Sequence, residues 1–163
     1  MLTRVQRSRR PKRTNVKVAI VASRYNTMYV DAMLRAAKKE LRRAGASVQV
    51  VRVPGAYEIP VVVERLARIS AGERNRHNCD AIVCLGVILR GETTHAAHIG
   101  EAVSSALMQI QLLHEIPVIH EVLLLENHEQ ARVRCLGKQH NRGLEAAQTA
   151  LAMAQVMQSL IVE

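Results

Sequence analysis

The sequence predicts an α/β fold, a three-layer αβα sandwich in which helices cover both faces of a four-stranded parallel sheet. Three observations support this prediction. Four short apolar runs, rich in Val and Ile, are spaced along the 163-residue chain. Between and after them, apolar residues recur at helical spacing. Strands that alternate with helices in this way form parallel sheets through right-handed crossovers, and the length suits one domain with a sizeable core.

The first part of the chain supplies two of the four strands. Residues 17–23, KVAIVAS, form a short β-branched run that is typical of a buried parallel strand. A helix is expected over 28–44, and Gly45 provides its C-terminal stop. Residues 47–53 form the second strand, which a Pro-Gly pair ends. The apolar face of the helix comprises Val30, Met33, Leu34, Ala37, Leu41 and Ala44.

The middle of the chain supplies the third strand and the helices on either side of it. A helix is expected from about Glu58 to Ser70, with Pro60 in its first turn, where a missing N–H costs nothing. Residues 80–89, DAIVCLGVIL, are the most hydrophobic run and predict a central strand. A long helix follows, roughly from Thr93 to Glu115. Its expected apolar stripe comprises Ile99, Val103, Ala106, Leu107, Ile110 and Leu113.

The last part of the chain supplies the fourth strand and two helices. Residues 117–125, PVIHEVLLL, predict the strand. The Asn127-x-x-Gln130 pair is a capping-box-like start of a short helix that ends near Cys135. A final helix is expected to run to about Leu160. Its apolar positions are Leu144, Ala147, Leu151 and Ala154.

The net charge of +9 is concentrated at the N-terminus. Residues 1–17 hold seven of the 23 basic side chains and none of the 14 acidic ones, which leaves a balance of +2 over the rest. We expect residues 1–15 to form a disordered basic arm and residues 16–163 to form one domain. Such an arm can bind nucleic acid by neutralising phosphates, but the near-neutral body argues against that function.

Secretion, membrane spanning and disulfide bonding are all disfavoured. The N-terminus lacks the apolar segment of a signal peptide, and no later apolar run reaches about 18 residues. The three cysteines, Cys79, Cys84 and Cys135, are odd in number and far apart, so neither a disulfide framework nor a structural zinc site is expected. These features are typical of a cytoplasmic protein.

The segments that follow the strands contain the candidate functional residues. Ligands of parallel sheets bind beyond the carboxyl ends of the strands. The four segments at that edge read SRYNT, PGAYEIP, LRGETTH and ENHEQ. Tyr25 and Tyr57 lie in the first two, in a chain with three Tyr, no Phe and no Trp. Aromatic side chains this rare, at strand ends, indicate contacts with a ligand.

The third of these segments has the features of an anion site next to a proton donor. A helix that begins after Gly91 offers unpaired N–H groups and a partial positive charge, although simple capping by Thr93 or Thr94 is the alternative. His95, in the first turn, suits general acid–base catalysis. His98 lies three residues on, but no third residue with metal-ligand spacing follows, so no metal is predicted.

Other sequence features concern nucleotides and a second anion site. The chain has no Gly-x-Gly-x-x-Gly and no Walker-type loop, which argues against dinucleotides and P-loop nucleotides. The segment RVRCLGKQHNRG gathers Arg132, Arg134, Lys138 and Arg142 before the last helix. These side chains form either a second anion clamp or a solvated basic turn.

Taken together, four segments resemble the 6,7-dimethyl-8-ribityllumazine synthase family. They are SRYN, VPGAYEIP, LGVILRGETTH and HEQARVRCLGKQHNRG, in family order, and the resemblance covers about residues 16–158. It implies a flavodoxin-like sheet and a transferase of riboflavin biosynthesis that needs no cofactor. The family joins 5-amino-6-(D-ribitylamino)uracil to 3,4-dihydroxy-2-butanone 4-phosphate, with loss of phosphate and water.

The resemblance also implies a role for each site residue. His95 takes the place of the proton donor. The residues expected at the phosphate are Glu92, Thr93 and Arg134. The residues expected to bind the rest of the substrates are Tyr25, Asn26, Ala56, Tyr57, Glu58, Val87, Ile88, Leu89, His120 and Arg142.

Several positions depart from the family pattern. Ala96 and Ala97 replace an aromatic and an acidic residue after His95. His120 stands in place of a Phe that reaches into the neighbouring subunit's site, and Glu121 in place of a glycine. Leu136 also replaces a glycine, and Arg142 replaces a lysine. These departures leave open a non-catalytic flavin- or lumazine-binding protein.

The resemblance further implies an oligomer with active sites at subunit interfaces. Family members form pentamers, and some assemble twelve pentamers into a shell. The compact turn before the last helix is compatible with a shell, whereas Pro11 in the arm argues against strand exchange with a neighbour. We expect a pentamer, leave the shell open, and allow an association with riboflavin synthase. Small molecules are the expected partners, and neither membrane nor nucleic acid is expected to bind.

Overall fold

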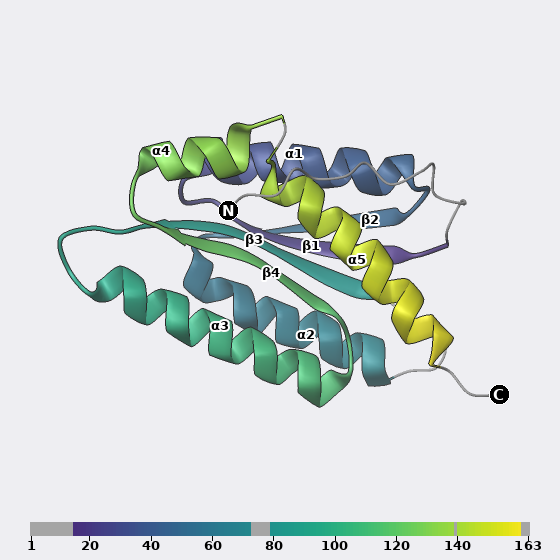
Figure 1. Ribbon diagram of the computed structural model, residues 1–163. Coiled ribbons are helices and arrows are strands. Elements are labelled where there is room, and N and C mark those ends of the chain that lie inside the picture. The colour runs from purple at the N-terminus through teal and green to yellow at the C-terminus, as the bar shows by residue number, and fades with distance from the viewer. Residues whose placement is uncertain (1–14, 73–78, 139, 161–163) are drawn as a thin grey trace.

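The computed structural model describes residues 15–72, 79–138 and 140–160. Within them, four parallel strands form one sheet in the order β2-β1-β3-β4. Helices α1 and α5 cover one face, and α2 and α3 cover the other (Figure 1). The predicted three-layer α/β class is therefore confirmed. The strands are β1 (Lys17–Ser23), β2 (Ser47–Val53), β3 (Ala81–Leu89) and β4 (Val118–Leu125).

Each connection carries a helix, and two short turns interrupt the regular pattern. The longer helices are α1 (Thr27–Arg43), α2 (Ile59–Gly72), α3 (His95–His114) and α5 (Arg142–Ser159). A 3₁₀ turn (Ala56–Glu58) precedes α2. After β4, the short helix α4 (His128–Ala131) runs into a π-helical turn (Arg132–Leu136). The predicted basic arm falls, except for residue 15, outside the described residues.

Alternate strand residues fill two separate cores. On β1, Ile20 points toward α1 and α5, whereas Val21 points toward α2 and α3, and both are fully buried. The predicted apolar face of α1 is buried, including Met33 and Leu41. Since strand side chains alternate between the faces of a sheet, a strand buried on both faces needs the unbroken apolar runs that the sequence shows.

Small residues let α1 and α5 approach closely. A Cβ added at Gly143 would lie 2.0 Å from the carbonyl oxygen of Met33. Further along α5, Ala147, Ala150 and Ala154 are buried against the same core. The helix therefore packs with its backbone close to α1. Helix α5 begins at Arg142, directly after its capping residue Asn141.

The expected boundaries hold to within a few residues, with three corrections. Helix α3 begins at His95 rather than Thr93, because Thr94 ends the preceding turn at φ −72° and ψ −4° and makes no side-chain cap bond. Leu113, expected on the buried stripe, is 73% exposed. The short helix after Asn127 changes to π-helical geometry before Cys135. Gly45, by contrast, has φ 80° as its predicted helix-stop role requires.

The cysteines and the helices relate to the expectations about disulfide bonds and membrane-spanning segments. Cys79, Cys84 and Cys135 are unbonded thiols, all buried. Burial raises the pKa of the Cys84 thiol, so this residue belongs to the core. Among the described residues, no helix is long and apolar enough to cross a membrane.

Candidate active site

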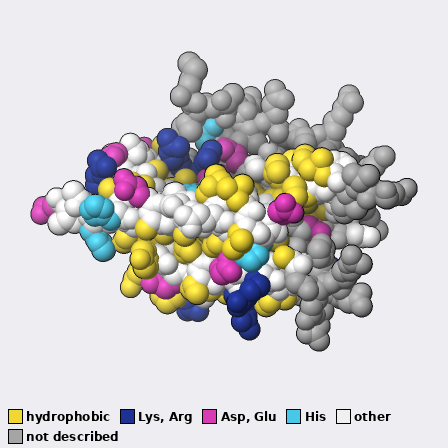
Figure 2. Space-filling view, turned by 90° about the horizontal axis from the view of Figure 1, so that it is seen from below, with side chains coloured by type: hydrophobic (Ala, Val, Ile, Leu, Met, Phe, Trp, Pro, Cys, Tyr) yellow, Lys and Arg dark blue, Asp and Glu magenta, His cyan; other side chains and the backbone are white. Residues whose placement is uncertain are grey.

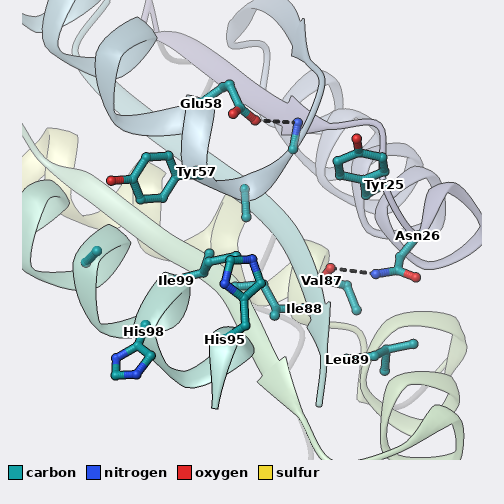
Figure 3. Close-up of a pocket in the computed structure, with 13 residues that line it drawn as sticks. Tyr25, Asn26, Tyr57, Glu58, Val87, Ile88, Leu89, His95, His98 and Ile99 are labelled. Carbon is teal, nitrogen blue, oxygen red and sulfur yellow. Dashed lines mark hydrogen bonds between the residues drawn. The ribbon is translucent and has the colours of Figure 1, made fainter. Parts of the chain in front are cut away.

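A pocket of about 720 Å³ opens at the carboxyl ends of β1, β2 and β3, beside the start of α3. Side chains from loops, from β3 and from α3 surround it (Figure 3). This is the edge at which parallel sheets bind ligands. The residues that line it are Tyr25, Asn26, Gly55, Ala56, Tyr57, Glu58, Val87, Ile88, Leu89, His95, His98, Ile99 and Ala102.

The segment after β1 holds an aromatic ring at the mouth of the pocket. The backbone N–H of Arg24 donates to the Val53 carbonyl at 2.9 Å, which ties this segment to the end of β2. Tyr25 follows, and its side chain is 69% exposed. A large ring left this exposed over a pocket offers a flat surface on which a heterocycle can stack.

Asn26 joins the ends of β1 and β3. Its backbone lies in the left-handed region (φ 55°, ψ 42°), which Asn adopts more readily than most residues. From there its side-chain Nδ2 donates to the Val87 carbonyl at 2.8 Å. This hydrogen bond ties the start of α1 to the pocket side of β3 (Figure 3).

Part of β3 has an unpaired backbone edge in the pocket. Pairing of β1 with β3 ends at Leu85, whereas pairing of β3 with β4 continues to Leu89. Beyond Leu85, the edge of β3 away from β4 therefore faces no other strand within the described residues. Its backbone groups, apart from the Val87 carbonyl that Asn26 engages, can bind the polar edge of a ring as a neighbouring strand would.

The turn after β2 positions a carboxylate and a second tyrosine at the pocket. The N–H of Gly55 donates to Glu58 Oε2 at 2.8 Å, which fixes the carboxylate against the turn. A Cβ at Gly55 would lie 2.9 Å from the ring of Tyr25, so glycine permits this packing. Tyr57 is 64% exposed and lines the same opening.

His95 begins α3 at the pocket. Figure 3 shows its imidazole within the opening, and the ring of His98 turned away from it. Preceding residues Glu92 and Thr93 are exposed and do not line the pocket, but they lie directly before the helix N-terminus. The N–H groups of this first turn, beside His95, suit an anion that must also gain or lose a proton.

Besides Glu92 and Thr93, three predicted residues, His120, Arg134 and Arg142, do not line this pocket. His120 lies on edge strand β4, on the face toward α3. Its Nδ1 accepts from the Val122 N–H at 3.3 Å, so the neutral ring carries its hydrogen on Nε2 and donates to Ser104 Oγ at 2.8 Å. Desolvation lowers the pKa of His120, which favours this neutral form.

Arg134 and Arg142 lie on the other side of β4, near the start of α5. Arg134 belongs to the π-helical turn. Asn141 links the π-helical turn that carries Arg134 to the helix that carries Arg142. Its Nδ2 donates to the Cys135 carbonyl at 2.6 Å, and its Oδ1 caps α5 by accepting from the Gly143 N–H at 3.0 Å. The two arginines therefore lie in one corner of the fold, the arginine corner, and neither lines the pocket of the same chain.

Sequence reasoning missed several residues of the pocket wall. Ile99 and Ala102 follow His95 at helical spacing on α3, so this spacing is the signal that could have identified them. His98 also belongs to the pocket wall, whereas its spacing from His95 alone suggests only a metal ligand. Among the described residues, no group of three His, Cys, Asp or Glu side chains is arranged to hold a metal ion.

Part of the surface of α2 and α3 is apolar. Figure 2 views this side of the molecule and shows hydrophobic side chains between charged ones. On α3, Met108, Leu112 and Leu113 are 54%, 70% and 73% exposed, and Val61 on α2 is 68% exposed. Large aliphatic side chains this exposed are typical of surfaces that contact another protein.

Comparison with known proteins gives one consistent result. The family model described as 6,7-dimethyl-8-ribityllumazine synthase matches residues 15–158. Proteins of that name from Stenotrophomonas maltophilia, strains R551-3 and K279a, are each 36% identical over 149 residues, which is 90% of this chain and 92% of theirs. One from Xanthomonas euvesicatoria pv. vesicatoria is 35% identical over 150 residues, 90% of this chain and 93% of its own.

Proposed function

Since the chain belongs to the 6,7-dimethyl-8-ribityllumazine synthase family, we propose that it catalyses this synthesis at a site shared by two copies of the chain. The enzyme is a transferase of riboflavin biosynthesis. It condenses 5-amino-6-(D-ribitylamino)uracil with 3,4-dihydroxy-2-butanone 4-phosphate. The observation that carries this assignment is the pocket that combines an exposed tyrosine, an open backbone edge and a helix N-terminus beside a histidine.

In this proposal the pocket binds the pyrimidine substrate. Tyr25 stacks on the ring, and Asn26 fixes the loop that carries it. The backbone of Val87, Ile88 and Leu89 binds the polar edge of the ring. The ribityl chain, which carries hydroxyl groups, lies against Ala56, Tyr57 and Glu58.

The phosphate of the second substrate binds at the start of α3. Glu92 and Thr93 contribute backbone N–H groups and the Thr hydroxyl there. Arg134 does not line the pocket of its own chain, and it belongs to the π-helical turn that packs against α1 and α5. We therefore assign the phosphate contact to Arg134 of a neighbouring copy, together with His120 and Arg142.

The proposed assembly is a pentamer, which some family members extend to a shell. The exposed aliphatic side chains of α2 and α3 support association of copies. Riboflavin synthase is a further proposed partner of this assembly. The buried, unbonded cysteines support a cytoplasmic location.

Each step of the proposed reaction requires a proton transfer in the pocket. The aromatic amine adds to the ketone, and loss of water gives an imine. Loss of inorganic phosphate with its bonding electrons follows, and the remaining nitrogen closes the ring with loss of a second water. His95 exchanges the protons, while Arg134 and the α3 N-terminus stabilise the charge of the leaving phosphate. Orientation of two reactive substrates supplies much of the remaining acceleration.

Coexpression of two variants tests both catalysis and the sharing of one active site between two copies of the chain. His95→Ala and Arg134→Ala should each lower turnover at least about tenfold, measured by formation of the lumazine chromophore. Coexpressed in equal amounts, the two variants form some interfaces with an intact pocket and an intact Arg134. Random assembly makes these about a quarter of all interfaces, so about a quarter of wild-type activity should return.

Two results would contradict the proposal in different ways. Folded wild-type protein that does not exceed the uncatalysed rate but binds flavin or lumazine would support the non-catalytic alternative instead. Active wild-type protein whose two variants fail to restore activity together would exclude a shared site. Coexpression of His95→Ala with wild type provides the reference for mixed assemblies.

A further inference from the structure

A buried carboxylate faces the two arginines beside α5. Glu121 is on β4 and is only 6% exposed. It lies between Ile119 and Leu123 on the strand face that packs on the α1 and α5 core, where these two neighbours contribute apolar side chains. Burial of a charged group among apolar side chains destabilises the fold unless the charge is paired. The partners of Glu121 therefore indicate its role.

Arg142 is the direct partner of Glu121. Its Nε donates to Glu121 Oε2 at 3.0 Å, and its Nη1 donates to Glu145, one turn along α5. The guanidinium is therefore engaged by two carboxylates, although about a third of the side chain (32%) is exposed. Arg142 is thus held in place rather than available as an independent anion clamp.

Arg134 differs from Arg142 in this respect. Within the part of the chain that the structure describes, no carboxylate forms an ion pair with Arg134. It acts on Glu121 by its charge alone, lowering the pKa of that carboxyl together with Arg142. Arg134 is therefore the arginine available for a phosphate, and Glu121 is a negative charge close to it.

We propose that Glu121 is a positioning residue for phosphate binding, which holds Arg142 through Nε and offsets the positive charge around Arg134. This inference rests on the proposed function, in which Arg134 binds the phosphate of a neighbouring copy's substrate. With Glu121 ionised, the charges of Glu121, Glu145, Arg134 and Arg142 sum to zero. With Glu121 protonated, they sum to +1, and an anion binds more tightly.

The groups that face Glu121 fix the pH range of this effect. Arg142 and Glu145 face it from α5, and Arg134 and Cys135 from the π-helical turn, whereas His120 points to the opposite face of the sheet. Burial is the largest influence and raises the pKa of Glu121 to about 7. Anion affinity should therefore fall as the pH rises through about 7, and a bound anion should in turn raise this pKa.

Sulfate is a suitable probe, because it stays a dianion from about pH 6 to pH 8.5 whereas phosphate titrates there. Glu121→Gln removes the charge and keeps an acceptor for Arg142 Nε. At about pH 8.5, we expect calorimetry to show about threefold or tighter sulfate binding by the variant than by wild type. At about pH 6 the two should bind alike.

Further variants separate this role from a structural one. Glu121→Ala also removes the charge, and its sulfate binding should show the same loss of pH dependence. It therefore tests the role of Glu121 if the Gln variant does not fold. Glu129→Gln, an exposed change beside Arg132, should leave sulfate binding unaltered at both pH values. In turnover, Glu121→Gln should lower the KM for the phosphorylated substrate at about pH 8.5 more than it changes kcat.

The outcomes distinguish this inference from the proposed function. Wild type that makes the lumazine, with sulfate affinities equal to those of Glu121→Gln at both pH values, overturns the role of Glu121 alone. The same holds if sulfate does not bind to wild type at either pH. Wild type that shows the pH-dependent difference but no turnover supports the role of Glu121 in anion binding and overturns the proposed function.

Discussion

At the scale of single residues, the site depends on polar side chains that bind backbone groups. The strand-end motifs predicted that Tyr25, Tyr57 and His95 would lie together, and all three line the pocket. The sequence could not show that Glu121 holds Arg142, because the two residues lie 21 positions apart on different elements. It also could not place Arg134, since only the folded chain shows which side of β4 an arginine occupies.

Asn26 provides a test at this scale. Asn26→Gly keeps access to the left-handed backbone but loses the hydrogen bond to the Val87 carbonyl, whereas Asn26→Ala loses both. Both variants should raise the KM for the pyrimidine substrate. Both should also lower the free energy of unfolding, and Asn26→Ala should lower it by about 1 kcal/mol more than the Gly variant does, because alanine is strained in the left-handed region. Denaturant titration and steady-state kinetics measure these effects, and equal stabilities would contradict the backbone argument.

At the scale of elements, periodicity predicted the strands and long helices, but local anchors set their ends. Arg90 donates its N–H to the Leu125 carbonyl at 2.8 Å and forms an ion pair with Glu126 at 3.3 Å. These contacts hold the residues before α3 against β4, so the helix starts only at His95. The π-helical turn was likewise beyond prediction from the sequence, because the contacts of this turn with α1 and α5 are tertiary.

The contact between α1 and α5 gives the prediction at this scale. Gly143→Ala would place a Cβ 2.0 Å from the Met33 carbonyl oxygen, so α5 must shift. We expect the free energy of unfolding to fall by about 2 kcal/mol or more. Gly100→Ala is the matched control on α3, where the nearest atom would lie at 3.6 Å. It should stabilise the protein by about 0.5–1 kcal/mol, as alanine does in helices. Similar losses in both variants would refute the close approach.

At the scale of the whole molecule, the residues of the proposed site lie in two separate places. Some line the pocket at the ends of β1, β2 and β3, and others lie in the arginine corner beside α5. The edge strand β4 lies between them, with His120 on one face and Glu121 on the other. Order along the chain does not show on which face of β4 these residues lie, so only the family resemblance implied that the site includes residues of a neighbouring subunit.

Association of copies should therefore be necessary for activity. Leu112→Glu combined with Leu113→Glu places two charges on α3, where both leucines are more than two-thirds exposed at 70% and 73%. The chain should stay folded, because neither side chain belongs to the core. Sedimentation should show smaller species, and turnover per chain should fall in proportion to the loss of interfaces. Leu160→Glu alters a leucine of similar exposure (65%) just past the end of α5 and serves as the control. A double variant that sediments as a monomer yet keeps wild-type turnover would show that one chain suffices, and Arg134 would then need another role.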